Sequence, residues 1–388
     1  MPDLAMKPSV APDLWAGLHV AGVLTTIVDI PTRRAHKLSS LSTSQQNYVL
    51  VRVRTADGVE GIGEAATLGG PRWSEESVEA IKANIDAYLA PAIVGERADL
   101  FELLGARMDQ AAKRNNAAKA AVESALFDVV GKTLGVPATT LLGGAVRDRM
   151  RVLWTLASGD PEQEVAEAEE KLALGLHNIF KVKLGAQTPR ADMARMARIA
   201  SALEGRAELI VDANQGWSET VARRCLDQMD GMGVTLVEQP LPAWDLAGMA
   251  RLRAACAIPL MADESIFTPD DAFAVGRAGA ADVVSLKLVK HGGLLGTRKV
   301  AAVCEAAGIG LYGGCLLESS VGAAAHLQVF ATLRRLDWHC EHFGPQILCD
   351  DLLIDPVAYD AFDVLVPQGH GLGIALDEDK VRHYTRKG

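Results

Sequence analysis

From residue 152 to residue 341 the sequence repeats one pattern, in which a short apolar run is followed by a stretch with helical spacing. Eight such runs occur, at 152–155, 179–184, 209–212, 235–238, 260–264, 283–288, 309–312 and 338–341. Near-continuous apolar runs are typical of buried parallel strands, and their alternation with helices indicates βα units. Eight βα units close into a barrel. The last run is followed by Phe343-Gly-Pro and not by an amphipathic helix, so we expect the eighth helix to be missing or altered. The sequence therefore predicts a modified (β/α)7β TIM-type barrel over residues 148–349.

The helix starts between these runs are well marked. Asp160, Thr188 and Thr268 each stand directly before a proline. Their side chains can accept hydrogen bonds from the first free backbone N–H groups, and proline suits the first helical position. Helices are therefore expected to begin after each of these three residues.

The residues before the predicted barrel show a different sequence pattern. Residues 48–54 alternate in polarity, turn at Asp57-Gly58 and return over 59–64, which predicts a β-hairpin. Helical spacing follows from Ser74, over 98–110 and over 116–134. We therefore predict an α+β capping domain at residues 22–147, preceded by an extension at 1–21. The tail at 350–388 is too short to fold alone and is expected to fold back onto the capping domain.

Composition excludes several classes of protein. The formal net charge is -10, without long charged runs, which argues against nucleic acid and anionic membranes as partners. No run is apolar for long enough to span a bilayer, and we see no signal peptide. The six cysteines are scattered, which is typical of free thiols in a reducing compartment. We therefore expect a cytoplasmic protein.

Ionisable residues recur inside or at the ends of the apolar runs, where an unpaired charge is costly. They are Lys181, Lys183, Asp212, Glu238, Asp263, Lys287 and Glu341. Successive intervals from 183 to 287 are 29, 26, 25 and 24 residues, about one βα unit each. In barrels, catalytic residues lie at the carboxyl ends of the strands, so this set is a candidate active site.

Lys181 and Lys183 lie two residues apart on one predicted strand, so both point to the same face. Either the two ammonium groups are solvated on a surface strand, or they share a partly dry interior. In the second case, repulsion is expected to lower the pKa of one of them, which suits a lysine that transfers protons.

Asp212, Glu238 and Asp263 come from three adjacent strands, roughly 5 Å apart. Three converging carboxylates are stabilised by a divalent cation, and oxygen ligands suit Mg²⁺ or Mn²⁺. Salt bridges to the lysines alone are the alternative. Lys183 and Lys287, on strands two and six, would face each other across the barrel. A metal on one edge and a lysine on each face suit proton transfer next to a substrate carboxylate.

The chain resembles the enolase superfamily, and within it the muconate-lactonising subgroup, from about residue 22 to 384. The resemblance is carried by His36-Lys-Leu-Ser, Glu60-Gly-Ile-Gly-Glu-Ala, Trp154-Thr-Leu-Ala-Ser-Gly-Asp, Lys181-Val-Lys, Met261-Ala-Asp-Glu-Ser, Gly310-Leu-Tyr-Gly-Gly, Leu317-Glu-Ser and Glu341-His-Phe-Gly-Pro. It implies interconversion of cis,cis-muconate and muconolactone in aromatic catabolism, with Mn²⁺ (or Mg²⁺) as cofactor. It also implies a small dicarboxylate substrate and a homo-oligomer, usually an octamer.

The resemblance also implies a role for each residue of the site. Asp212, Glu238 and Asp263 would hold the metal. Lys183 would transfer the proton and Lys181 would tune it. Lys287 would stabilise charge from the opposite face, and Glu341 would be a further acid or hydrogen-bond donor.

Other activities stay open at this point. The same site could serve a chloromuconate cycloisomerase, an N-acylamino acid racemase or an o-succinylbenzoate synthase. A different class, the Schiff-base aldolases, also carries a lysine on strand six, where Lys287 lies. The aldolase interpretation leaves the three carboxylates unexplained. A glycine pair, Gly292-Gly293, could bind a substrate carboxylate or form only a tight turn.

Overall fold

The computed structural model describes residues 17–387, so most of the predicted extension at 1–21 lies outside the described residues. An antiparallel sheet opens the chain, with β1 (Val20–Lys37), β2 (Ser42–Thr55) and β3 (Glu60–Thr67) in the order β1-β2-β3. The predicted hairpin is confirmed, with Gly58 at φ +86° in its turn. The helical elements that follow are α2 (Val78–Asn84), the π-helical η1 (Ile85–Leu89), α3 (Ala90–Ile93), α4 (Phe101–Ala111), α5 (Asn116–Leu134) and α6 (Ala138–Leu141).

Helix α5 packs closely on β3 because two glycines make room for it. A Cβ atom on Gly61 or Gly63 would collide with the backbone oxygens of Ala125 and Ala121 in α5. The middle of α5 is buried on all sides between the sheet and the rest of the molecule. This packing makes the three strands and α5 one unit.

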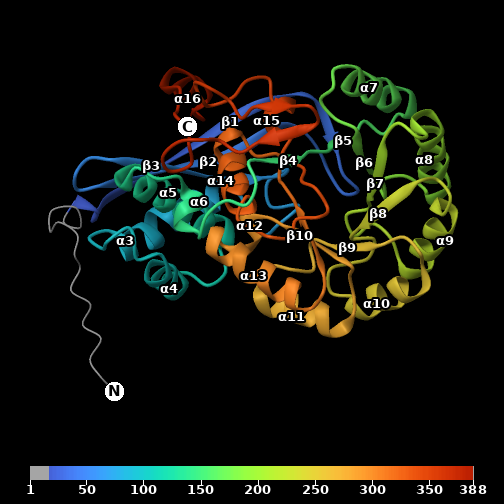
Figure 1. Ribbon diagram of the computed structural model, residues 1–388, viewed down its shortest axis with the longest axis horizontal. Helices are drawn as coiled ribbons and strands as arrows, with labels where there is room; N and C mark the ends of the chain where they lie inside the picture. Colours follow the sequence, from blue (N-terminus) through green and yellow to red (C-terminus); the bar gives the residue numbers. More distant parts are fainter. Residues whose placement is uncertain (1–16, 388) are drawn as a thin grey trace.

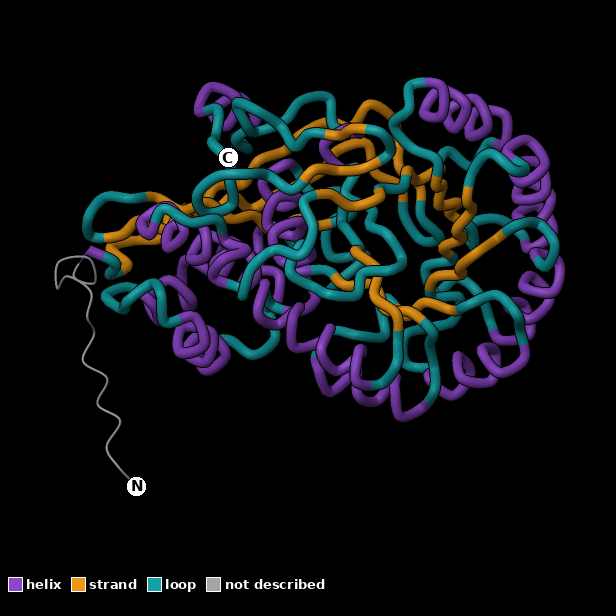
Figure 2. Tube along the Cα trace, viewed as in Figure 1, coloured by secondary structure: helices purple, strands orange, loops and turns teal. Residues whose placement is uncertain are grey.

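Seven parallel strands form the second sheet, in the order β11-β10-β9-β8-β7-β6-β5. They are β5 (Trp154–Leu156), β6 (Ile179–Lys183), β7 (Glu208–Asp212), β8 (Val234–Glu238), β9 (Leu260–Ala262), β10 (Val283–Leu286) and β11 (Gly310–Gly313). Their helices are α7 (Pro161–Ala173), α8 (Pro189–Leu203), α9 (Glu219–Met229), α10 (Leu246–Ala255), α11 (Pro269–Ala278), α12 (Leu288–His291), α13 (Leu294–Ala306) and α14 (Ser320–Phe330). Figure 1 shows the curled sheet with α7 to α11 along its outside, and Figure 2 shows the same arrangement of outer helices and inner strands.

The eighth strand is reduced to a single bridging residue. Cys340 forms parallel bridges with Val152 on one side and Gly313 on the other. The backbone N–H of Cys340 donates to Arg151 O at 3.0 Å. The next element is the one-turn helix α15 (Gly344–Ile347), so the prediction of a missing or altered eighth helix is confirmed. The ring of strands is therefore closed by a segment, not by a full βα unit.

The predicted helix caps are confirmed. Asp160 accepts from the N–H groups of Glu162 and Gln163, and Thr188 accepts from Ala191. Thr268 forms a reciprocal capping box with Asp271 at the start of α11.

The tail contacts both the barrel and the capping sheet. Strand β13 (Asp363–Leu365) pairs with β12 (Tyr359–Asp360) and with β4 (Arg149–Arg151). After α16 (Glu378–Tyr384), Thr385 bridges to Val28 in β1, and Arg386 forms an ion pair with Asp29 at 2.6 Å. The boundaries at 147 and 349 stay a prediction. Within residues 17–387, no helix is long and apolar enough to cross a membrane.

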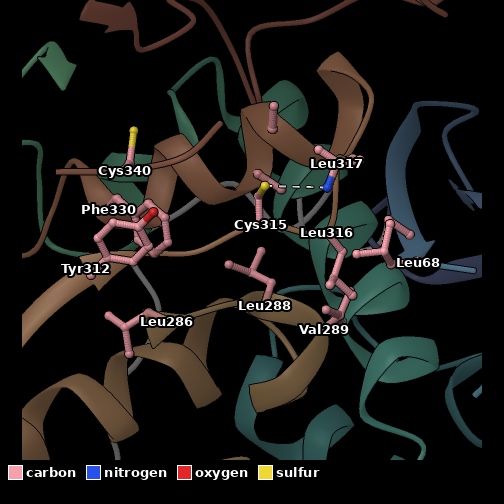
Figure 3. Packing of buried hydrophobic residues seen from close by; sticks show 14 of the residues in the cluster. Leu68, Leu286, Leu288, Val289, Tyr312, Cys315, Leu316, Leu317, Phe330 and Cys340 are labelled. Atoms are coloured by element: carbon pink, nitrogen blue, oxygen red, sulfur yellow. Dashed lines mark hydrogen bonds between the residues drawn. The ribbon is translucent and has the colours of Figure 1, made fainter. Parts of the chain in front are cut away.

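The capping sheet holds the loop that follows β11. The side chains of Gln46 and Tyr48 donate to Leu316 O at 2.6 Å and to Leu317 O at 2.7 Å. Leu68, just after β3, belongs to the same buried cluster as Leu316 and Val289 (Figure 3). The cap therefore lies directly against the end of the barrel where the charged residues gather.

Candidate active site

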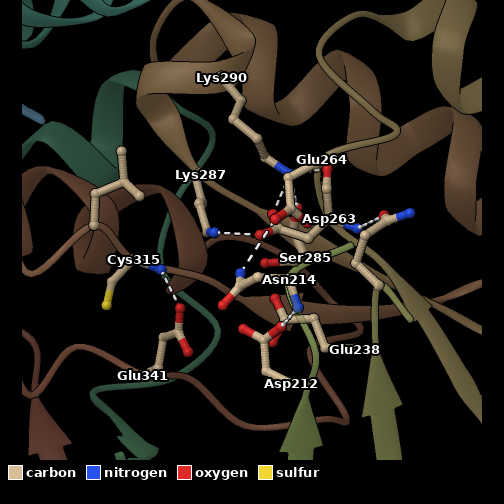
Figure 4. A network of polar contacts seen from close by, with 12 residues as sticks. Asp212, Asn214, Glu238, Asp263, Glu264, Ser285, Lys287, Lys290, Cys315 and Glu341 are labelled. Carbon is tan, nitrogen blue, oxygen red and sulfur yellow. Dashed lines mark hydrogen bonds and ion pairs between the residues drawn. The ribbon is translucent and has the colours of Figure 1, made fainter. Parts of the chain in front are cut away.

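The carboxyl ends of the barrel strands bring the predicted site residues together. The register pairs Lys183 with Asp212, and Asp212 with Glu238. Asp263 and Lys287 lie one residue beyond β9 and β10, which end earlier than the apolar runs predicted. All seven predicted site residues are buried or nearly so. Figure 4 shows the side chains from β7, β8 and the ends of β9 and β10 around one space.

The two lysines of β6 bind different carboxylates. Lys181 Nζ lies 2.5 Å from Glu238 Oε2 and also contacts Glu341. Lys183 Nζ lies 2.5 Å from Asp212 Oδ2 and 3.2 Å from the amide oxygen of Asn214. Since both ammonium groups point into the barrel, the surface-strand alternative is excluded.

The prediction that the pKa of either Lys181 or Lys183 is lowered is wrong. Burial by itself would lower the pKa of Lys183, and Lys181 adds to that effect, but the carboxylates of Asp212, Glu238 and Glu341 together outweigh both and the pKa is raised. The pKa of Lys181 is raised well above its usual range, because Glu238 and Glu341 outweigh its burial. Carboxylates from neighbouring strands, and not the second lysine, dominate the electrostatics of this strand.

Asp263 is bound by two lysines. Lys287 Nζ lies 2.6 Å from its Oδ2, and Lys290 Nζ lies 2.7 Å from its Oδ1. These cations hold the pKa of Asp263 well below its usual range despite burial. Lys287 also lies 4.3 Å from the ring centroid of Trp73, which comes from the loop after β3. Sequence reasoning missed Lys290, because its spacing of three residues from Lys287 brings both lysines to Asp263 only when a turn of helix follows β10.

Glu341 accepts three hydrogen bonds. The backbone N–H of Cys315 donates to Oε1 at 2.8 Å, Tyr312 donates to Oε2 at 2.8 Å, and Lys181 also contacts Oε2. Burial would raise the pKa of Glu341, but Lys181 and the other lysines lower it to about 2. The role of an acid or donor for Glu341 stays a prediction that this bonding does not favour, because the carboxylate is ionised.

Two neighbouring residues complete the polar network. Asn214 donates to Glu264 Oε1 at 3.1 Å and receives a hydrogen bond from Lys183. Burial and the charge of Asp263 raise the pKa of Glu264 to about 7. Glu264 ends the run at 260–264, but Asn214 lies two residues beyond the run at 209–212, so the pattern of runs did not point to Asn214.

The predicted metal ligands are compatible with a divalent cation but are not preassembled around one. Within residues 17–387, no group of three His, Cys, Asp or Glu side chains stands in an arrangement that could hold a metal ion as it is. Asp212, Glu238 and Asp263 each bind a lysine instead. However, Glu238 Oε1 is buried without a hydrogen-bond partner. Burial and the negative charge of Asp212 raise the pKa of Glu238 well above its usual range. A hard cation with oxygen ligands would satisfy both features.

A cavity of about 240 Å³ opens beside Lys183 under the cap. Lys37 and Leu38 line it from the capping strands, and Ala157 and Gln187 line it from the barrel loops. Lys183 is the one predicted site residue among those that line it.

The glycine pair after α12 does not face this cavity. The N-terminus of α13 is filled by the carboxylate of Glu123, which accepts from the N–H of Leu295 at 3.2 Å. A Cβ atom on Gly293 would collide with that carboxylate. Binding of a substrate carboxylate at Gly292-Gly293 is therefore wrong, because a side chain from α5 already occupies the position.

Comparison with known proteins places the chain in a family. Residues 22–143 match the model of the mandelate racemase/muconate lactonizing enzyme N-terminal domain, and residues 163–380 match the enolase C-terminal domain-like model. Muconate cycloisomerase 1 of Pseudomonas putida is 44% identical, over 92% of this chain and 96% of its own length. A chloromuconate cycloisomerase of Cupriavidus necator is also 44% identical, over 95% and 100%.

Solved structures agree with these matches. The muconate lactonizing enzyme of Pseudomonas fluorescens, complexed with muconolactone, superposes with a TM-score of 0.94 at 44% identity, over 95% of this chain and all of that one. The 2-chloromuconate cycloisomerase of Rhodococcus opacus 1CP gives 0.93 at 41% identity, with the same coverage. The chain therefore belongs to the mandelate racemase/muconate lactonizing enzyme family of the enolase superfamily.

Proposed function

We propose that this protein is a muconate cycloisomerase, an isomerase that interconverts cis,cis-muconate and muconolactone in the catechol branch of aromatic catabolism (the β-ketoadipate pathway). The observation that carries the proposal is Lys183, a buried lysine that lines the cavity and bonds to Asp212 at the end of β6. The identity to relatives named muconate cycloisomerase supports it.

The proposed site uses the chain's own residues in distinct roles. Asp212, Glu238 and Asp263 would hold a divalent cation, Mn²⁺ in preference to Mg²⁺, and the cation would supply stabilisation of negative charge on the substrate carboxylate. Lys181 keeps Glu238 and Glu341 in place through its two ion pairs.

Proton transfer is assigned to Lys183. One carboxylate oxygen of muconate adds to the conjugated double bond, a C–O bond forms, and the electron pair moves to an enolate at the other carboxylate. Lys183 Nζ then donates its proton to the carbon next to that carboxylate, and it removes the same proton in reverse. Lys287 lies on the opposite side and stabilises the enolate charge.

The test is direct. Purified protein with MnCl2 is expected to remove the ultraviolet absorbance of cis,cis-muconate, with muconolactone identified by NMR. EDTA is expected to abolish turnover, and added Mn²⁺ to restore it. A protein that leaves muconate unchanged while converting 2-chloromuconate, or an N-acylamino acid, would transfer the proposal to that substrate. Size-exclusion chromatography tests the homo-octamer, and the cytoplasmic location stays a prediction.

The aldolase alternative is poorly supported by the geometry. An imine-forming lysine must be neutral when it attacks a carbonyl. Lys287 instead forms an ion pair with Asp263. Asp263 and the other carboxylates of the site together outweigh burial and raise the lysine pKa. Trapping of substrate on Lys287 by borohydride, with activity that survives EDTA, would favour the aldolase.

A further inference from the structure

Lys290 is a buried lysine next to the site to which no role has been assigned above. Its side chain is fully buried, and it comes from the one-turn helix α12. This turn begins at Lys287 and reverses the chain, with Lys290 N bonded to Lys287 O at 3.0 Å. The turn therefore brings two lysines, three residues apart, to the same carboxylate.

All three protons of the Lys290 ammonium group have acceptors. Nζ donates to Asp263 O at 2.7 Å, to Asp263 Oδ1 at 2.7 Å and to Ser285 O at 2.8 Å. The ammonium group is thus tied to both the backbone and the side chain of Asp263. A second tie holds Lys290 itself, since the Asn116 amide in α5 donates to Lys290 O at 2.5 Å.

The two carboxylate oxygens of Asp263 accept hydrogen bonds from different lysines. Oδ1 is turned toward Lys290, whereas Oδ2 is turned toward Lys287 and the space between the carboxylates (Figure 4). We propose that Lys290 is a positioning residue that fixes the Asp263 carboxylate so that Oδ2 alone is presented to the cation. The proposal rests on the assignment of Asp263 as a metal ligand under the proposed function.

Two physical effects of Lys290 act in opposite directions on cation binding. Its positive charge repels a divalent cation, so its removal would by Coulomb's law tighten binding. Its hydrogen bonds hold the ligand in place, and loss of such an outer partner typically weakens metal affinity 10–100-fold. The sign of the change therefore distinguishes positioning from charge.

The experiment measures Mn²⁺ affinity by the electron paramagnetic resonance of free Mn²⁺, without substrate. Lys290→Met, which keeps the length of the side chain, is expected to raise the Kd for Mn²⁺ about 10–100-fold. Lys290→Gln, which keeps two N–H donors, is expected to lie between it and the wild type. The matched control is Lys119→Met in α5, another buried lysine with a carboxylate partner, Asp109 at 2.7 Å. The control is expected to leave the Kd unchanged.

Each outcome decides the proposal. A Kd that is unchanged or lower in both Lys290 variants overturns it, as does failure of both variants to fold, which would make the role purely structural. A wild type that does not bind Mn²⁺ overturns it together with the metal site. A wild type that binds Mn²⁺ but does not convert muconate overturns the proposed function alone, and the Lys290 comparison still stands.

Discussion

At the mouth of the barrel, Lys181 and Lys183 stand two residues apart on strand β6, whereas Lys287 and Lys290 are separated by a turn of helix. The β6 pair spreads over three carboxylates from three elements, Asp212, Glu238 and Glu341. The second pair converges on the single carboxylate of Asp263.

The difference follows from backbone geometry. On a strand, residues i and i+2 point the same way but lie at different depths, so each lysine meets a different neighbour. In a turn of helix, residues i and i+3 lie side by side and can reach one group. The β6 pair therefore links strands to each other, while the other pair fixes one residue from two sides.

The largest expected effect is that of removing Lys183, the only one of these four lysines that lines the cavity beside β6. Lys183→Ala is expected to lower kcat for muconate by about 10²–10⁴-fold, because it removes the proton carrier. The decrease in absorbance of cis,cis-muconate measures it.

A surface lysine supplies the control for this variant. Lys82→Ala in α2 removes an ion pair with Asp86 far from the barrel mouth and should leave kcat unchanged. A Lys183→Ala enzyme that still lactonises normally would contradict the assignment of the proton carrier.

The second prediction compares the two lysine pairs by the unfolding free energy that is lost when one lysine is removed. Lys181→Met leaves two buried carboxylates, Glu238 and Glu341, without their cation, and should lower the free energy of unfolding by about 3–5 kcal/mol. Lys287→Met should cost less, because Lys290 stays on Asp263. Urea unfolding in the presence of EDTA compares the variants. Equal losses would show that the second lysine does not compensate, and the contrast between the pairs would fail.

How much of this site could be predicted depends on which interactions are local. The run at 179–184 places β6 to within one residue, because apolar patterning reports burial directly. The convergence of Asp212 and Glu238 follows from the regular spacing of βα units. Lys290 could not be placed, because its direction depends on how α12 turns the chain after β10.

The pKa shifts of the two β6 lysines could not be predicted from the sequence for a related reason. The spacing of Lys181 and Lys183 shows that they share a face, but not how many carboxylates meet them there. The sign of the pKa shift of Lys183 depends on that number, and so it was predicted wrongly. The fold-level prediction succeeded except at the eighth strand, where Cys340 alone bridges its neighbours.

A buried carboxylate outside the lysine network extends the comparison. Glu64 in β3 is bound by the hydroxyl and backbone N–H of Ser319, the latter at 3.1 Å, and no ion pair to it forms among residues 17–387. Burial raises its pKa to about 8, and the nearby charges of Glu318 and Asp351 add to the effect. Unlike Asp263 or Glu341, this group is therefore protonated in the folded protein at neutral pH.

The smallest effect we predict is the pH dependence that follows from this protonation. The unfolded chain releases the proton near the ordinary pKa of 4.5, whereas the folded protein keeps it up to about pH 8. Between these values folding binds a proton, so stability falls as the pH rises, by up to about 1.4 kcal/mol per pH unit. Glu64→Gln cannot ionise and loses this slope. The unfolding free energy of Glu64→Gln minus that of the wild type should therefore increase from pH 5.5 to pH 8, as measured by urea titrations.

The exposed Glu162→Gln is the control, since Glu162 is paired with Arg198 on the surface. The prediction is contradicted if the difference in unfolding free energy between the wild type and Glu64→Gln is the same at both pH values. Glu64 would then be ionised in the folded protein, with its carboxylate stabilised by the hydrogen bonds from Ser319.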